Sequence, residues 1–412
     1  MGTEHIFDRR RRLAATLADR ILSGIYRLAA GLGLVHHEAP DLTSVRPERI
    51  LVIQLDRIGD TVMSTPVYAA LKSAYPESHV TALVRPLSRD LLRHNPHVDD
   101  CLFHSPPWWS GARGLAKIGA YLRYLPDYLR LVRRLRSRRF DLAIELRGDL
   151  RHILLYATLG NCRYRVGYER AGGADLRTHP IPFDPQLHLV ESNVHLLEPL
   201  GIEVEAPALD VWVGEEDEAA LVDRLRDLGI SRRQQLIVVH PGGRISTKLW
   251  PTDRFVQVID RLAEADGAPV VLIGGPEERA LCEGIASRAS RAAPVVLAGQ
   301  LSLGELAALL KRADLFLGGD SGPQHLAAAM GTPAVVLFGP TDPAIYGPWS
   351  DQANVVLNPP SCSPCFHPSC PVSGGEWSAC MEEIEVGDVC AAVRRFRAEL
   401  MNDGDRQGGE GV

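Results

Sequence analysis

The sequence of 412 residues contains no run of 18 apolar residues, which is about the length that a helix needs to cross a bilayer. It also lacks two glycine signatures of nucleotide-binding loops. The apolar run at 270–273 is not followed by Gly-x-Gly-x-x-Gly, and Gly-x-x-x-x-Gly-Lys-Ser/Thr occurs nowhere. These absences argue against membrane-spanning proteins, dinucleotide oxidoreductases and P-loop nucleotidases.

Cysteine is scarce outside one segment. Five of the eight cysteines fall between Cys362 and Cys390, whereas a disulfide framework would distribute them along the chain. The N-terminal segment has no compact apolar core followed by a small-residue cleavage site, so a secretory signal is not expected. A reduced, cytoplasmic protein is therefore predicted.

Basic and acidic residues are unevenly distributed along the chain. Residues 1–206 carry 28 Lys/Arg against 23 Asp/Glu, whereas the remainder carries 17 against 28. The first half therefore suits an anionic partner better, although nucleic acid is disfavoured because the whole chain is negative and no nucleic-acid-binding module is present. Residues 111–139 contain nine Lys/Arg and one acid, Asp127, which indicates either a phosphorylated or lipid-linked partner or a solvated helix face.

What is present is a repeated alternation of short apolar runs and amphipathic segments, which predicts parallel sheets covered on both faces. The periodicity lapses within an acid-rich stretch, residues 191–223, where ten acids occur without any Lys or Arg. We predict an α/β protein with two facing doubly wound domains. The expected parts are a helical extension at 1–46, domains at 47–205 and 206–400, and a disordered tail at 401–412.

The extension combines Arg9–Arg12 with leucines and isoleucines at helical spacing. Three interpretations stay open for it: a helix resting on an anionic membrane surface, a docking helix, or a frayed end.

The segment DLFLGGDSGPQHLAAAMGTP places a glycine-rich turn between an expected strand and a short helix. The N-terminus of such a helix presents free N–H groups and a positive dipole end, which suit phosphate oxygens. Asp320 and Ser321 either serve this site, together with Gly322, or simply cap the helix. His325 lies further along the same helix, where packing is an equal alternative.

Two other loops follow strands of the second half. HPGGRISTKLW supplies exposed backbone at Gly242 and Gly243, hydroxyls at Ser246 and Thr247, and a point charge at Lys248 that suits a diphosphate. In the next loop, IGGPEE, Glu277 or Glu278 is an acceptor for ribose hydroxyls.

In the first half, the equivalent loop is QLDRIGDTVMSTP, with Asp60 at the start of a helix that we expect over about residues 61–75. Asp60 either caps that helix or accepts a proton from an attacking hydroxyl. A carboxylate at a helix N-terminus is a weak base, so the second role requires burial or a second acid beside it.

The four cysteines Cys362, Cys365, Cys370 and Cys380 have the spacing C-x2-C-x4-C-x9-C. Four thiolates suit a tetrahedral structural zinc or iron, and His367 is an alternative ligand. Packing thiols or a disulfide pair are the competing interpretations.

Taken together, RILVIQLDRIGDTVMSTPVYAALK, VVHPGGRISTKLWP and DLFLGGDSGPQHLAAAMGTPAVVLFGPTDP resemble glycosyltransferase family 9, the ADP-heptose:lipopolysaccharide heptosyltransferases, over about residues 49–397. The resemblance implies a GT-B fold, in which two Rossmann-like domains face each other, and an inverting transfer whose catalysis needs no metal. It implies Asp60 as general base, Lys248 as diphosphate ligand and Glu277 near the ribose, with Asp320, Ser321 and Gly322 around the diphosphate and sugar. It also implies contacts to an acidic, often phosphorylated acceptor from Arg57, Arg85, Arg147 and Arg151, for which solvation at the surface is the competing interpretation.

The expected reaction moves heptose from ADP-heptose to a lipopolysaccharide core acceptor, with peripheral contact to the cytoplasmic face of the inner membrane. A family branch that heptosylates autotransporter proteins holds iron in a similar cysteine cluster, so a protein acceptor or another sugar stays open. A non-catalytic binding module stapled by metal is the alternative from a different class.

Overall fold

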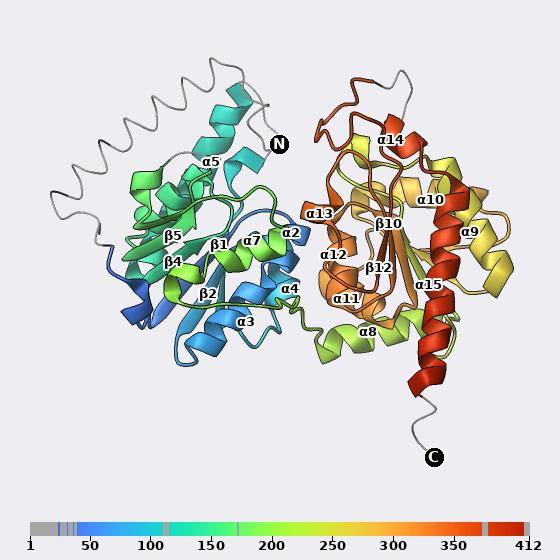
Figure 1. Cartoon of the computed structure of the whole chain (residues 1–412), viewed down its shortest axis with the longest axis horizontal. Coiled ribbons are helices and arrows are strands. Elements are labelled where there is room, and N and C mark those ends of the chain that lie inside the picture. Colours follow the sequence, from blue (N-terminus) through green and yellow to red (C-terminus); the bar gives the residue numbers. More distant parts are fainter. Residues whose placement is uncertain are drawn as a thin grey trace. The chain divides into compact units, whose positions relative to one another are not determined.

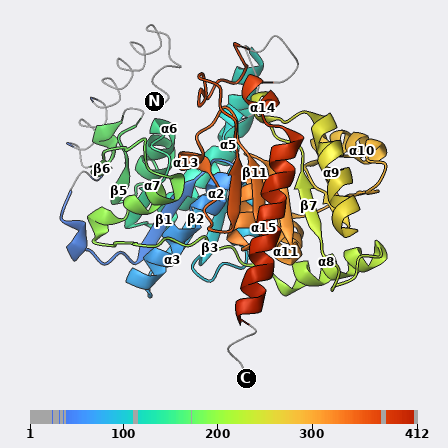
Figure 2. The same ribbon diagram turned by 45° about the vertical axis from the view of Figure 1, so that its right-hand side comes forward.

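The computed structural model describes residues 24, 31, 36, 39–109, 115–170, 173–372 and 378–407. The chain divides into two compact units, Met1–Asp210 and Val211–Val412 (Figures 1 and 2). The sequence predicts this division between residues 205 and 206. Most of the expected extension at 1–46 lies outside the described residues.

The N-terminal unit is built on a six-stranded sheet in the order β3-β2-β1-β4-β5-β6, and every neighbouring pair is parallel. Its strands are β1 (Arg49–Gln54), β2 (His79–Val84), β3 (Asp100–Phe103), β4 (Leu142–Glu145), β5 (Tyr164–Tyr168) and β6 (His179–Ile181). Its helices are α2 (Ile58–Met63), α3 (Thr65–Ala74), α4 (Arg89–Leu92), α5 (Leu115–Arg138), α6 (Leu150–His152) and α7 (Leu189–His195).

Helices cover both faces of this sheet because alternate residues of its strands point in opposite directions. Ile50 and Val52 of β1 belong to one buried cluster, whereas Leu51 and Ile53 belong to another. All four side chains are fully buried. A strand that is apolar on both faces is typical of a doubly wound parallel sheet, as the sequence predicts.

The C-terminal unit repeats this topology in the order β12-β11-β10-β7-β8-β9. Its strands are β7 (Ile237–His240), β8 (Val270–Leu272), β9 (Val295–Val296), β10 (Leu315–Gly319), β11 (Ala334–Leu337) and β12 (Ala353–Val356). Its helices are α8 (Glu215–Asp227), α9 (Thr252–Asp266), α10 (Arg279–Arg288), α11 (Leu303–Arg312), α12 (Gly322–Ala329), α13 (Pro343–Tyr346), α14 (Ala379–Glu382) and α15 (Val386–Gln407).

In both sheets the first and fourth strands in chain order are neighbours, so the sheet order reverses there. Ligands of doubly wound proteins bind beyond the carboxyl ends of the strands at such a reversal. The loops after β1 and β4 therefore meet in one unit, and those after β7 and β10 meet in the other.

The structure corrects three local expectations. The helix expected over 61–75 is two helices, because Pro66 occupies an N-terminal position of α3 and cannot donate to the preceding turn. Strand β5 was not apparent from the sequence because the buried Arg165 interrupts its apolar pattern; its guanidinium donates to the carbonyls of Leu176 and Cys162. Finally, α15 continues to Gln407 and so includes residues 401–407 of the expected tail, of which 408–412 lie outside the described residues.

In the part of the chain that the structure describes, no helix has both the length and the hydropathy required to cross a membrane.

Candidate active site

Asp60 lies directly beyond the carboxyl end of β1. It is the third residue of α2, and its Oδ2 accepts the N–H of Arg57 at 3.0 Å. Asp60 therefore caps the helix, as one interpretation of the sequence predicts. Its side chain is still 18% exposed, so the carboxylate also remains accessible to a small hydroxyl.

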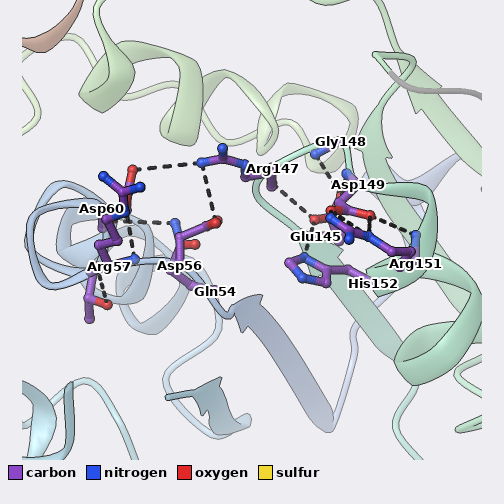
Figure 3. Close-up of polar contacts among 11 residues, drawn as sticks. Gln54, Asp56, Arg57, Asp60, Glu145, Arg147, Gly148, Asp149, Arg151 and His152 are labelled. Carbon is purple, nitrogen blue, oxygen red and sulfur yellow. Dashed lines mark hydrogen bonds and ion pairs between the residues drawn. The ribbon is translucent and has the colours of Figure 1, made fainter. Parts of the chain in front are cut away.

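A second acid, Asp56, lies buried beside Asp60 (Figure 3). The Nη1 atom of Arg147 lies 3.3 Å from Asp56 Oδ1 and 3.9 Å from Asp60 Oδ1, so one guanidinium contacts both carboxylates. The other oxygen of Asp56 is buried without a hydrogen-bond partner among the described residues. Burial raises the pKa of Asp56 to about 6, although Arg147 opposes this shift.

The loop that carries Arg147 is fixed by Glu145, the last residue of β4. The fully buried carboxylate of Glu145 accepts the N–H groups of Arg147 at 3.1 Å and Gly148 at 2.7 Å. It also lies 3.1 Å from Nδ1 of His152. Gly148 has a φ of +73° and a Cβ there would lie 2.8 Å from the Cβ of Arg170, so the turn requires glycine.

His152 and Glu145 form a buried ion pair beneath this loop. Burial alone would lower the pKa of His152, but the hydrogen bond and the charge of Glu145 outweigh burial and raise it. The pair therefore supports the loop after β4 from the interior side, whereas Arg147 points toward Asp56 and Asp60 (Figure 3).

The other arginines expected at the acceptor side lie nearby in the fold. Arg151 forms an ion pair with Asp149 at 2.5 Å and places its guanidinium 4.5 Å from the ring centre of Trp108. Arg57 is the N-cap residue of α2, and Arg85 follows β2 at the same carboxyl edge of the sheet.

In the C-terminal unit, Lys248 and Asp320 come together from the loops after β7 and β10. Lys248 Nζ lies 2.5 Å from Asp320 Oδ2, and their side chains are 19% and 7% exposed. Asp320 also accepts hydrogen bonds from the hydroxyl of Thr341 and, at 3.3 Å, from the amide of Gln324. The ammonium group is thus held in one orientation by a carboxylate with three donors.

Ser321 is the N-cap residue of α12, but its side chain does not cap the helix. Its hydroxyl instead lies 2.9 Å from Nδ1 of His240, whose Nε2 lies 3.2 Å from Glu278. Gly322 begins α12, and its N–H has no acceptor within the helix, whereas Pro323 has no N–H and Gln324 donates to the carbonyl of Ser321. The N-terminal end of α12 and Lys248 both lie beside the Asp320–Ser321 turn.

Glu278, rather than Glu277, is integrated into this network. Burial would raise the pKa of Glu278, but hydrogen bonds from His240 and from the N–H groups of Gly275 and Gly243 lower it. A Cβ at Gly242 would lie 2.2 Å from Glu278, so this close approach needs glycine. Glu277 is exposed. His240 was not among the predicted residues, although it occurs within the quoted HPGG motif.

The remaining predicted residues divide between surface and interior. Ser246 is exposed, whereas Thr247 is buried and donates to the carbonyl of His367 at 3.0 Å. His325 is also buried, with Nε2 at 3.4 Å from the amide of Gln324.

The cysteine-rich segment packs against the loops after β7 and β11. Cys362, Cys365, Cys370 and Cys380 line one cavity of about 140 Å³, together with His367 and Thr247. Burial and the neighbouring thiols raise the pKa of Cys380 to about 11. Within the described residues, however, no three of these sulfurs lie within 4.8 Å of one another.

The family model for glycosyltransferase family 9 (heptosyltransferase) matches residues 128–374, which is more than half of the chain. The chain belongs to glycosyltransferase family 9. Membership makes it a glycosyltransferase, as the resemblance of its three motifs implies. It is 32% identical to lipopolysaccharide heptosyltransferase 3 of Escherichia coli K12 over 302 residues, which cover 71% of this chain and 83% of the relative.

Solved structures of the family have the same fold. E. coli ADP-heptose lipopolysaccharide heptosyltransferase II superposes with a TM-score of 0.68 and 20% identity, covering 86% of this chain and 99% of that one. The iron-containing dodecameric glycosyltransferase TibC from enterotoxigenic E. coli superposes with a TM-score of 0.50 and 17% identity, covering 86% and 77%. The predicted GT-B class, with two Rossmann-like units, is confirmed.

Proposed function

We propose that this family 9 enzyme transfers heptose from ADP-heptose to a lipopolysaccharide core acceptor. The support for the substrates is that the E. coli relatives are named for them, and that the similarity extends over most of each relative. A cytoplasmic location, with contact to the inner membrane where a lipid-linked acceptor would be available, is part of this proposal.

The donor diphosphate binds the C-terminal unit at the turn Asp320–Gly322. Lys248 and the N-terminal end of α12 supply positive charge, and Asp320 orients Lys248 rather than contacting phosphate itself. The observation behind this assignment is the 2.5 Å contact between Lys248 and Asp320. Negative charge grows on the diphosphate as it leaves, so donors fixed beforehand stabilise the transition state.

Glu278 accepts the ribose hydroxyls in this proposal, in place of Glu277. Its carboxylate is held by His240 and by the N–H of Gly275 at 2.7 Å, whereas Glu277 has an exposed side chain. A fixed acceptor loses less conformational entropy on binding than a freely rotating one.

Asp60 acts as the general base of an inverting transfer. It takes the proton of the acceptor hydroxyl, whose oxygen forms a bond to the anomeric carbon. The bond between that carbon and the diphosphate breaks on the opposite face, and its electron pair leaves with ADP. Catalysis requires no metal in this mechanism, because Lys248 and α12 neutralise the leaving group.

Asp56 is the acid that lies beside Asp60. The Nη1 atom of Arg147 lies 3.3 Å from Oδ1 of Asp56. The negative charge of Asp56 thus holds the guanidinium near Asp60 and prevents it from pairing with Asp60 alone. Asp56 is thus a positioning residue. Arg147 is 46% exposed, and in this proposal it contacts an anionic group of the acceptor together with Arg57, Arg85 and Arg151.

A structural metal at the cysteine cluster is a separate part of the proposal. The four thiols line one cavity and a cation would relieve their mutual repulsion, but residues 362–372 must rearrange to bring the sulfurs together. Zinc and iron both suit such ligands. Metal analysis of purified protein, with C365A as the matched variant, tests this directly.

The experiment that tests the function is to incubate the protein with a panel of sugar nucleotides and with lipid-core or protein acceptors. Mass spectrometry of the products identifies donor and acceptor, and NMR of the new linkage reports inversion or retention. Transfer of heptose to the core from ADP-heptose is expected, with activity unchanged by EDTA. Transfer to a protein, or of a different sugar, would favour the alternatives within the family.

A further inference from the structure

Helix α5 has an exposed apolar stripe that the fold of its own unit does not use. Leu122, Leu125 and Leu129 are 65%, 45% and 42% exposed, and their spacing of three and four residues places them along one side of the helix. Leu131 and Leu135, on another side, are buried in the unit's core. The helix is therefore anchored along one side while leucines remain in water on another.

The exposed part of α5 is also strongly basic. Residues 115–138 contain seven Lys/Arg and one acid, Asp127, which pairs with Arg130. The exposed arginines are Arg123, Arg130, Arg133, Arg134 and Arg136. Solvation alone explains arginines on a helix surface, but it does not explain three exposed leucines among them.

We propose that this face of α5 binds the surface of an anionic phospholipid bilayer. The leucines would enter the boundary between head groups and acyl chains, and the arginines would contact lipid phosphates. Charge complementarity favours this occupant over an apolar groove of a partner protein, because a groove would have to bury the arginines without compensating acids.

The position of α5 connects this surface to the candidate acceptor loop. Tyr128 donates to the carbonyl of Leu155 at 2.9 Å, so α5 is fixed to the segment that follows α6. Trp108, a few residues before α5, contacts Arg151. Part of α5 projects beyond the sheet of its unit (Figures 1 and 2). A bilayer on this helix would bring a lipid-linked acceptor to the Arg147–Arg151 loop, an advantage that rests on the proposed function, whereas the binding itself does not.

Sedimentation of the full chain with vesicles tests the inference. Vesicles of phosphatidylcholine with phosphatidylglycerol are compared with vesicles of phosphatidylcholine alone. We expect binding to the anionic vesicles that weakens with salt, and a loss of about tenfold in the variant L122S/L125S. R133E should lose about fivefold or more, since each basic residue near a charged surface contributes on this scale.

L357S is the matched control, because Leu357 is 42% exposed in the C-terminal unit and should leave binding unchanged. Transfer to a water-soluble acceptor should be the same in L122S/L125S and wild type, which separates membrane binding from catalysis. If the wild-type protein binds neither kind of vesicle, the inference is overturned. So would undiminished binding of L122S/L125S, because the contact would then lie elsewhere, such as in residues 1–38.

Discussion

Each unit of this enzyme pairs an accessible cation with a more buried aspartate, but the two aspartates differ in how fully their oxygens are hydrogen-bonded. In the C-terminal unit, Lys248 contacts Asp320 at 2.5 Å, and Thr341 and Gln324 supply further donors to that carboxylate. In the N-terminal unit, Arg147 lies 3.3 Å from Asp56, whose other oxygen is buried and has no partner among the described residues.

This difference matches the chemistry that we propose for each unit. A leaving diphosphate needs positive charge that is already oriented, because reorientation during the reaction would raise the barrier. A site that accepts a proton needs a carboxylate that can change its charge near neutral pH. A buried acid with few hydrogen bonds to its charged form has a raised pKa and can do so. One topology therefore supports two kinds of pair. We call Lys248 and Asp320, whose carboxylate is fully hydrogen-bonded, the saturated pair, and Arg147 and Asp56 the titratable pair.

The largest effect is expected at Asp60. D60N should lower kcat by about a thousandfold, since a positioned general base contributes on that order. Binding of ADP-heptose, measured by calorimetry, should change little because we propose that the donor binds the other unit. D253N serves as the control, since Asp253 is an exposed acid with 77% side-chain exposure. Full activity in D60N would remove the base from the mechanism.

A smaller effect is expected at the saturated pair. K248A should cost about 3 kcal/mol of transition-state stabilisation, or roughly a hundredfold in kcat. D320N should cost less, and the double variant should resemble K248A alone, because Asp320 acts through Lys248. K311A, which changes an exposed lysine, is the control. Additive losses would indicate that Asp320 has an independent role.

The titratable pair predicts a pH effect. Burial raises the pKa of Asp56 to about 6, so its negative charge is present above that pH and is lost below it. We expect kcat/KM of the wild type to fall as the pH drops through about 6, because protonated Asp56 no longer holds Arg147. D56N should lack this limb while losing about tenfold in activity at pH 8. An unchanged pH profile in D56N would show that Asp56 does not cause this limb, and that the two pairs do not differ in the way we propose.

The smallest effect concerns the hydrogen bond between Thr247, the neighbour of Lys248, and the cysteine-rich segment. T247V removes the 3.0 Å hydrogen bond to the carbonyl of His367. Unfolding by urea should show a loss of about 1 kcal/mol in the free energy of unfolding, typical of one buried hydrogen bond. S246A, at the exposed neighbour, should show no loss. Equal stability of the two variants would mean that the segment does not support the donor loop through this bond.

Most of the fold was predictable because the information is local. Apolar runs such as Arg49–Gln54 are recognisable without any tertiary contact, whereas β5 was missed because its buried arginine interrupts the pattern and depends in part on the carbonyls of Leu176 and His36, which lie outside the segment. The sequence also predicts Asp60 and Lys248 as site residues, from loop chemistry and from resemblance, and these roles stay predictions. That His240 contacts Glu278 rather than Glu277 is a tertiary contact, and no local pattern distinguishes two adjacent glutamates.

The sequence by itself determined the alternating strands and helices, the glycine-rich loops at strand ends and the family. Each of these depends on neighbouring residues or on contiguous motifs. Only the tertiary structure decided that Arg147 contacts Asp56 and that Asp320 orients Lys248. Both contacts arise because the fourth strand of each sheet lies beside the first, and this order, not separation along the chain, sets which loops meet.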